Sequence, residues 1–247
     1  MKKIFIALIV LIFSVCFVNS VDAHGFGLAK NNEHKQPDIG KYANIIEGTD
    51  SYYVGSNEEK VVYFTFDAGY DNGVLSQILD VLKEKDVKAT IFVTGDFLER
   101  ETELVKRIVE EGHIIGNHTY NHKNITKLDE NGLKKEIEKV EQKYYEITGK
   151  EMVKFFRPPA GEFDKQSLLN VKDLGYKTFF WSIAYHDWDV NKQHGSNFAY
   201  NAVMNNLHNG AILLMHTVST DNLGALPKVI DDIRSQGYTI KNLTEFK

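Results

Sequence analysis

The feature that most restricts the fold is an alternation of short apolar runs with amphipathic stretches, which begins at Val61 and continues to the end of the chain. The apolar runs have the length and the composition of buried strands, and the stretches between them repeat apolar residues at the helical period. Such an alternation predicts repeated βαβ units and a parallel sheet. The predicted strands lie at residues 61–66, 89–95, 113–118, 153–159, 177–183, 211–216 and 238–243.

A helix follows each predicted strand except the last, and this order favours a barrel or barrel-like closure over an open sheet. No linker rich in Pro, Gly or Ser and no internal repeat divides the region, so residues 61–247 are predicted to form one α/β domain. Residues 24–60 show no sustained period and are expected to form an extended lead-in that packs on this domain. Glycines suited to helix C-caps lie where the predicted helices should end, at Gly112, Gly149, Gly175 and Gly237.

Residues 1–23 have the order of charged, apolar and small residues that is typical of a secretory signal peptide, with cleavage expected after Ala23. A membrane anchor is the alternative, but the uninterrupted apolar run from Ile4 to Phe13 is short for a span of about 20 residues. Removal of the signal would leave no membrane span. Cys16 is the only cysteine and lies in this segment, so the exported protein would have no disulfide. The formal net charge of −5 gives no sign of the basic face that nucleic-acid binding usually needs.

Chemically capable side chains lie at the ends of several predicted strands. In parallel α/β folds the carboxyl ends of the strands form the binding face, so these groups are expected to converge. Each also has an ordinary structural explanation, such as a helix cap or loop carboxylate for the aspartates, an ion pair for the arginine and a buried position for the histidines. Their joint position is what favours a functional site. In chain order they are Asp67, Thr94, His118, Arg157, Asp187 and His216.

His118 and His122 are four residues apart in the stretch HTYNH. On a helical turn this spacing presents both imidazoles on one side, as a divalent metal ion needs. The spacing alone is weak support in a chain with nine histidines, so metal binding depends on the surrounding groups.

Together these groups suit the hydrolysis of an amide. A metal ion held by imidazoles would polarise the acyl oxygen and a bound water. Asp67 would take a proton from that water, and His216 would protonate the leaving nitrogen. Arg157 would keep Asp67 ionised, and Asp187 would stabilise the imidazolium of His216. Several aromatic side chains nearby would either stack on a sugar ring or pack in the core: Tyr70, Phe163, Tyr185 and Trp188.

Five motifs, TFDAG, HTYNH, RPPAG, DW and LLMHT, occur in the order and spacing of the polysaccharide deacetylase (NodB-homology) family, carbohydrate esterase family four. The resemblance covers about residues 60–243 and implies a distorted (β/α) barrel with about seven parallel strands. It also implies catalytic roles for the residues above, a divalent metal with zinc as the first candidate, and contacts with substrate. The implied residues are the base Asp67 with its partner Arg157, the acid His216 tuned by Asp187, the metal ligands His118 and His122, and the substrate contacts Tyr70, Pro159, Phe163 and Trp188.

Further stretches, GYDNG, NEHKQPDIGKY, ITGK and SIAYHDWDVNKQHG, resemble the sporulation-type peptidoglycan de-N-acetylases of this family, which prepare muramic acid for δ-lactam formation in spore cortex. The resemblance implies an exported bacterial enzyme of the cell wall or spore envelope that removes the N-acetyl group of N-acetylmuramic acid in peptidoglycan strands. The alternatives are a deacetylase of N-acetylglucosamine in peptidoglycan or chitin-like oligomers, and a catalytically impaired glycan-binding protein. No oligomeric state is implied.

The sequence departs from the family pattern at Ala68, where the first motif usually has a second aspartate that binds the metal. A methyl group cannot coordinate, and catalytic zinc normally has three protein ligands, so weak metal binding is expected. Substrate oxygens could complete the metal's ligand shell, Asp71 or Asn72 could reach in, or the enzyme could depend on metal little or not at all. The sporulation-type subgroup commonly lacks this acid and is nonetheless catalytic. Ala160, where relatives often have a larger side chain, is expected to widen the groove.

Overall fold

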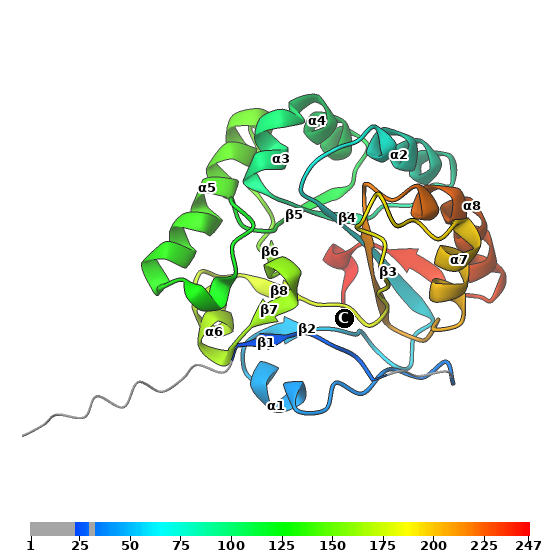
Figure 1. Ribbon diagram of the computed structural model, residues 1–247, viewed down its shortest axis with the longest axis horizontal. Helices are drawn as coiled ribbons and strands as arrows, with labels where there is room; N and C mark the ends of the chain where they lie inside the picture. The colour runs from blue at the N-terminus through cyan, green and yellow to red at the C-terminus, as the bar shows by residue number, and fades with distance from the viewer. Residues whose placement is uncertain (1–22, 30–32) are drawn as a thin grey trace, which may run out of the picture.

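The computed structural model describes residues 23–29 and 33–247, and its centre is a curled sheet surrounded by helices (Figure 1). The sheet has eight strands, its main path runs β10-β3-β4-β5-β6-β8-β2, and β9 also pairs with β3. Every strand pair within it is parallel. A bridge between Ile183 and Leu213 joins the segment after β8 to β9 and brings the sheet round. The strands are β2 (Ser51–Tyr52), β3 (Val61–Ala68), β4 (Thr90–Val93), β5 (Ile114–Asn117), β6 (Phe155–Phe156), β8 (Lys177–Phe179), β9 (Ala211–His216) and β10 (Thr239–Lys241).

All seven predicted strands are present, and the predicted distorted barrel is confirmed. The eighth strand, β2, was not predicted, because a two-residue strand leaves no periodic pattern. It comes from the lead-in, which also contributes the helix α1 (Tyr42–Ile46) and the strand β1 (His24–Gly25), paired antiparallel with β7 (Glu162–Phe163). The lead-in is therefore part of the folded domain, not only a wrapping. The predicted signal peptide, apart from Ala23, lies outside the described residues, and no helix in 23–29 or 33–247 is long and apolar enough to cross a membrane.

Side chains at the helix ends explain why several helices begin and end where they do. The Asp129 side chain accepts a hydrogen bond from Gly132 N at the start of α5 (Glu130–Thr148), and this helix is capped by Gly149, whose φ of 65° confirms the predicted glycine cap. Asp164 and Ser167 form a capping box at the start of α6 (Lys165–Asp173). The longer helices are α2 (Val74–Glu84), α3 (Gly95–Arg100), α4 (Thr102–Glu110), α5 (Glu130–Thr148), α6 (Lys165–Asp173), α7 (Ser196–Met204) and α8 (Thr220–Ser235).

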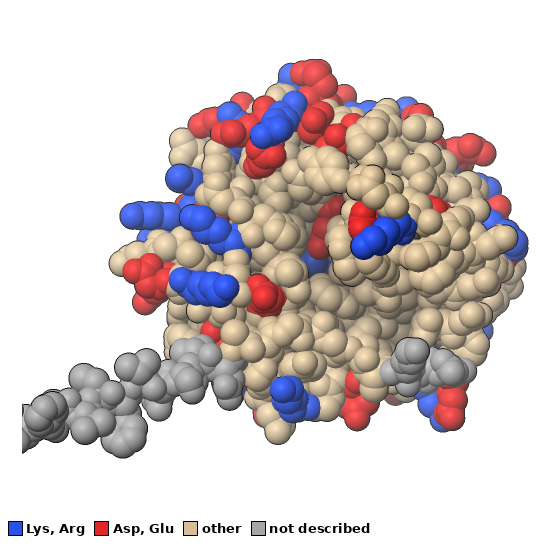
Figure 2. Space-filling view, in the orientation of Figure 1, with Lys and Arg blue, Asp and Glu red and all other residues tan. Residues whose placement is uncertain are grey.

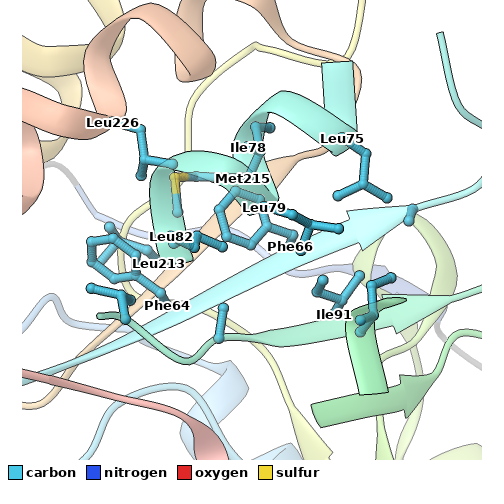
Figure 3. Close-up of a cluster of buried hydrophobic side chains, with 14 of the residues drawn as sticks. Phe64, Phe66, Leu75, Ile78, Leu79, Leu82, Ile91, Leu213, Met215 and Leu226 are labelled. Atoms are coloured by element: carbon cyan, nitrogen blue, oxygen red, sulfur yellow. The ribbon is translucent and has the colours of Figure 1, made fainter. Parts of the chain in front are cut away.

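Strand β3 is buried on both sides, and its alternate residues serve different layers. Phe64, Phe66 and Ala68 pack in the large apolar cluster between the sheet and the outer helices (Figure 3). Tyr63 faces the smaller cluster inside the curled sheet, and Asp67, two positions beyond Thr65, lines a cavity. Because side chains alternate along a strand, tight packing of one face fixes which residue the other face delivers to the strand end.

The adjacent tyrosines of α5 test this packing. Tyr144 is buried in the large apolar cluster, whereas Tyr145 is 54% exposed. We expect Tyr144→Ala to lower the free energy of unfolding by about 3 kcal/mol or more, because it leaves a cavity among packed side chains. Tyr145→Ala, the matched control, should change it by no more than about 0.5 kcal/mol. Urea denaturation of the two variants measures the difference, and equal losses would contradict the assigned packing.

Candidate active site

A cavity of about 1000 Å³ opens where the carboxyl ends of the strands meet. Figure 2 shows a hollow on this face with acidic and basic atoms at depth and mainly uncharged surface around it. The chain brings its walls together from distant segments, as a parallel barrel predicts. Its lining residues include Phe26, Asp67, Tyr70, Thr94, His118, His122, Ala160, Trp181, Trp188, Leu214 and His216.

Asp67, at the end of β3, is held by a buried ion pair with Arg157. Arg157 Nη1 lies 2.8 Å from Asp67 Oδ1, while its Nε and Nη2 donate to the carbonyl oxygens of Phe179 and Phe180. Burial alone would raise the pKa of Asp67, but the charge of Arg157, assisted by His118 and His216, lowers that pKa below its ordinary 3.8. Asp67 is therefore an ionised carboxylate with one fixed oxygen, and its Oδ2 remains free of Arg157.

His118 and His122 lie close together, but not as predicted from helical spacing. They follow β5 in a loop in which Thr119 and His122 have left-handed φ values of 63° and 52°, so the assumed helical turn is wrong. The two ring centroids are nevertheless 5.0 Å apart, because Glu136 of α5 accepts hydrogen bonds from Asn121 N and Nδ2 and fixes the loop.

The ring nitrogens of His118 have distinct surroundings. Nδ1 lies 2.8 Å from the carbonyl oxygen of Arg157, which can only accept, so Nδ1 carries the hydrogen and the Nε2 lone pair faces Asp67 Oδ2 at 3.6 Å. Burial lowers the pKa of His118 to about 4, and it also lowers the pKa of His122. Both imidazoles are consequently neutral at pH 7.

His216, at the end of β9, is directly beside Asp67, because the two residues are partners in the β3–β9 ladder. Asp187 lies behind it, with Oδ1 2.7 Å from His216 Nδ1 and Oδ2 accepting from His216 N at 2.8 Å. Burial opposes charging of the imidazole, but the hydrogen bond and charge of Asp187, together with Asp67, raise the pKa of His216 above its ordinary 6.5. Nδ1 of His216 carries a hydrogen that it donates to Asp187. The other ring nitrogen, Nε2, does not contact Asp187, and His216 lines the cavity.

The donor set does not match a three-ligand zinc site. Within residues 23–29 and 33–247, no three His, Cys, Asp or Glu side chains are grouped to hold a metal ion. Ala68 is fully buried in the apolar cluster on the helix side of β3. The idea that Asp71 or Asn72 reaches in is wrong for this structure: Asp71 accepts from Gly73 N and Leu75 N, and Asn72 bonds Val218 O and Val74 N.

Two of the four expected substrate contacts line the cavity, and two do not. Tyr70 and Trp188 line it and are 46% and 54% exposed. The expectation for Phe163 is wrong, because this side chain is fully buried and packs against Phe26 and Phe180. Pro159 is also buried and does not reach the cavity.

Three further expectations concern Ala160, Thr94 and Tyr185. Ala160 lines the cavity, with a left-handed φ of 54°. Thr94 also lines it, but the Thr94 hydroxyl accepts from Phe97 N as the cap of α3, the ordinary structural role. The Tyr185 hydroxyl donates to Asn222 and Tyr185 does not line the cavity, so this residue has a structural role and is not a sugar contact.

Sequence reasoning missed three aromatic residues of the cavity wall, Phe26, Tyr120 and Trp181. Tyr120 lies within the HTYNH stretch, between His118 and His122. Trp181 follows β8 by two residues, so its position near a strand end was a usable signal. Phe26 lies in the lead-in, where no pattern points to a site, and it reaches the wall because its ring stacks on Phe180 at 4.4 Å. Gly161 lies beside both Phe26 and Trp181, and a Cβ at residue 161 would be 2.6 Å from the Trp181 ring.

Comparison with known proteins agrees with this geometry. Residues 54–179 match the family described as polysaccharide deacetylase. A Bacillus subtilis protein named peptidoglycan-N-acetylmuramic acid deacetylase PdaA is 43% identical over 221 residues, which cover 89% of this chain and 84% of the relative. A solved structure of B. subtilis PdaA, described as a family 4 carbohydrate esterase, matches with a TM-score of 0.88 and 42% identity over 91% of this chain and 97% of that chain.

A Bacillus cereus protein named peptidoglycan-N-acetylglucosamine deacetylase is also similar, with 34% identity over 189 residues, 75% of this chain and 67% of the relative. The two named relatives share the reaction and differ in the sugar. The resemblance inferred from the five motifs is confirmed: the chain belongs to the polysaccharide deacetylase family.

Proposed function

We propose that this protein is a hydrolase that removes the N-acetyl group from N-acetylmuramic acid in peptidoglycan strands, in the cell wall or spore envelope, which it reaches by export. The observation that carries the proposal is the adjacency of Asp67 and His216 in the β3–β9 ladder, each with its own buried partner. The similarity to PdaA over nearly the whole chain supports the choice of sugar. The signal-like N-terminus supports export.

The chain's own residues supply the proton transfers of amide hydrolysis. Asp67 accepts a proton from water through Oδ2, while Arg157 holds Oδ1 and keeps the carboxylate oriented. The oxygen of that water bonds to the acetyl carbon, which becomes tetrahedral. His216 Nε2 then gives its proton to the sugar nitrogen, the C–N bond breaks, and acetate and a free amine result. Tyr70 and Trp188 form exposed aromatic walls on which the sugar would stack.

The first prediction from the proposed function concerns turnover. Purified protein should release acetate from peptidoglycan strands that lack stem peptides, and Asp67→Asn should lower kcat by at least about 100-fold, because general-base catalysis contributes about 10² to 10⁴. Asp96→Asn, which changes another carboxylate of the cavity wall, is the control. Mass spectrometry of the digested product identifies the sugar that lost its acetyl group.

Loss of acetyl from N-acetylglucosamine would favour the activity named for the B. cereus relative. Strands bound equally well by wild-type and Asp67→Asn protein, with no acetate released by either, would instead indicate a glycan-binding protein. Each result replaces the proposed function with a defined alternative.

The second prediction concerns pH. The pKa of Asp67 is lowered below its ordinary 3.8, so Asp67 stays ionised over the working range. The alkaline limb of kcat/KM should therefore report deprotonation of His216 and lie above pH 6.5. Asp187→Asn removes the negative charge of Asp187, which contributes more than Asp67 to raising the pKa of His216, so the limb should move to lower pH. Asp189→Asn, in the same loop, should leave it in place. An unmoved limb in Asp187→Asn would show that another group controls it.

The third prediction concerns metal. We propose that His118 and His122 would hold a divalent ion, zinc first among candidates, and hold it weakly because Ala68 offers no third ligand. Such an ion would polarise the acyl oxygen of the substrate. In titration calorimetry with zinc, His122→Ala should raise Kd by at least about tenfold, since even outer-shell changes weaken metal sites by 10- to 100-fold. His34→Ala, in the lead-in, is the control. Zinc binding unchanged by His122→Ala would remove the proposed site.

A further inference from the structure

The Asp187–His216 pair is the front of a longer hydrogen-bonded chain. Asn222 Nδ2 donates to Asp187 Oδ2 at 2.6 Å and to the carbonyl oxygen of His216 at 3.1 Å. The Tyr185 hydroxyl lies 2.7 Å from Asn222 Oδ1. Asn222 and Asp187 are each 1% exposed, and neither Asn222 nor Tyr185 lines the cavity. The chain therefore runs behind the imidazole, away from substrate.

Chemistry fixes the direction of every bond in this chain. A carboxylate only accepts, so the NH₂ group of Asn222 must face Asp187, and Oδ1 must then face Tyr185. Tyr185 consequently donates. Burial, with the nearby charges of Asp187 and Asp221, raises the pKa of Tyr185, which keeps its proton in place. The Tyr185 hydroxyl supplies the donor for Asn222 Oδ1 and so adds a third hydrogen bond that holds the amide in this orientation.

Helix α8 holds the chain in position from its first turn. Ser219 Oγ caps the helix by accepting from Asn222 N, which fixes the Asn222 backbone. Gln193, near the other end of the Asp187 loop, donates to Asp187 O and accepts from Asp221 N and Ser219 Oγ. The turn that carries Asn222 thus anchors the loop that carries Asp187.

We propose that Asn222 and Tyr185 are positioning residues for the general acid: Asn222 holds the Asp187 carboxylate against His216, and Tyr185 fixes the amide of Asn222 in the orientation that does so. The inference rests on the proposed function, because it assigns the chain to the proton donor of that reaction. It goes beyond it by adding two residues that touch neither substrate nor the reacting atoms.

The groups that face His216 determine what a substitution can change. Besides Asp187, the charged or titratable side chains that act on it are Asp67, Arg157 and His122. They come from β3, from the segment after β6, and from the loop after β5. Substitution of Asn222 or Tyr185 leaves all three untouched, so a change in the acid must come through Asp187 or through the His216 carbonyl oxygen that Asn222 also bonds.

The first test separates kcat from KM. Asn222→Leu removes both polar ends of the side chain at similar volume, and Tyr185→Phe removes only the hydroxyl. We expect kcat to fall about 10- to 100-fold for Asn222→Leu and less for Tyr185→Phe, with KM within about twofold of wild type. Two controls lie away from the Asp187–His216 pair. Tyr200→Phe removes a hydroxyl bonded to Asp232 at 2.6 Å, and Asn206→Leu removes an amide that donates to the carbonyl oxygen of Ala202 in α7. Both variants should retain wild-type kcat.

The second test uses the conservative variant Asn222→Asp. Two carboxyls in contact share one proton, with one pKa strongly raised. Below that pKa the new carboxyl is protonated and donates to Asp187 as the amide does, so kcat relative to wild type should recover as pH falls. Above it the two carboxylates repel and relative kcat should fall. Thermal melting at each pH measures the folded fraction, so that kcat refers to folded protein.

The third test needs no activity. Hydrogen–nitrogen NMR of wild-type protein should show the His216 Nδ1 hydrogen as a downfield, slowly exchanging resonance, because it is bonded to Asp187. The resonance should be lost or broadened in Asn222→Leu and kept in Asn206→Leu. Persistence of the resonance in folded Asn222→Leu, or kcat within twofold of wild type for both Asn222→Leu and Tyr185→Phe, would overturn the proposal. If wild-type protein released no acetate, the proposed function would fail while this resonance still decided the positioning role.

Discussion

The buried pair of Arg157 and Asp67 is the interaction on which the site depends. Taking both charges out of water costs several kcal/mol for each ion, and only full pairing with further hydrogen bonds offsets that cost. Arg157 meets this requirement by bonding Asp67 and the carbonyl oxygens of Phe179 and Phe180, with its guanidinium over the Phe92 ring. The pair ties β3 to the segments after β6 and β8, so the strand ends that form the cavity have one relative arrangement.

At the carboxyl ends of β3 and β9, a deprotonated carboxylate, Asp67, lies beside an imidazole that favours its protonated form, His216. Arg157 keeps Asp67 ionised, and Asp187 favours the charged form of His216, although burial opposes charge on both. Asp67 and His216 also stabilise each other, because a negative and a positive charge on neighbouring strands attract strongly in a low-dielectric interior. A carboxylate without its proton and an imidazole with an added proton can thus coexist over the same range of pH.

The departure at Ala68 has a structural context. Alternation along β3 sends Asp67 to the cavity and Ala68 to the apolar cluster that α2 and α3 also line, where the methyl group is fully buried. The two neighbouring imidazoles are brought together by a loop with two left-handed residues, held by Glu136, rather than by helical spacing. The site therefore contains two buried carboxylate pairs, Asp67 with Arg157 and Asp187 with His216, and offers a metal ion few protein ligands.

The sequence by itself determined the seven main strands, the parallel sheet and the residues that gather at its mouth. These follow from local periodicity and from the rule that parallel strands end on one face, which needs no knowledge of packing. It did not determine that Phe163 and Pro159 are buried, that Phe26 of the lead-in reaches the cavity, or that β2 completes the sheet. Nor did it reveal that Asn222 and Tyr185 stand behind Asp187. Only tertiary structure decided these positions, because each depends on contacts between segments far apart in the chain. A local sequence pattern does not specify which distant residue a side chain will contact.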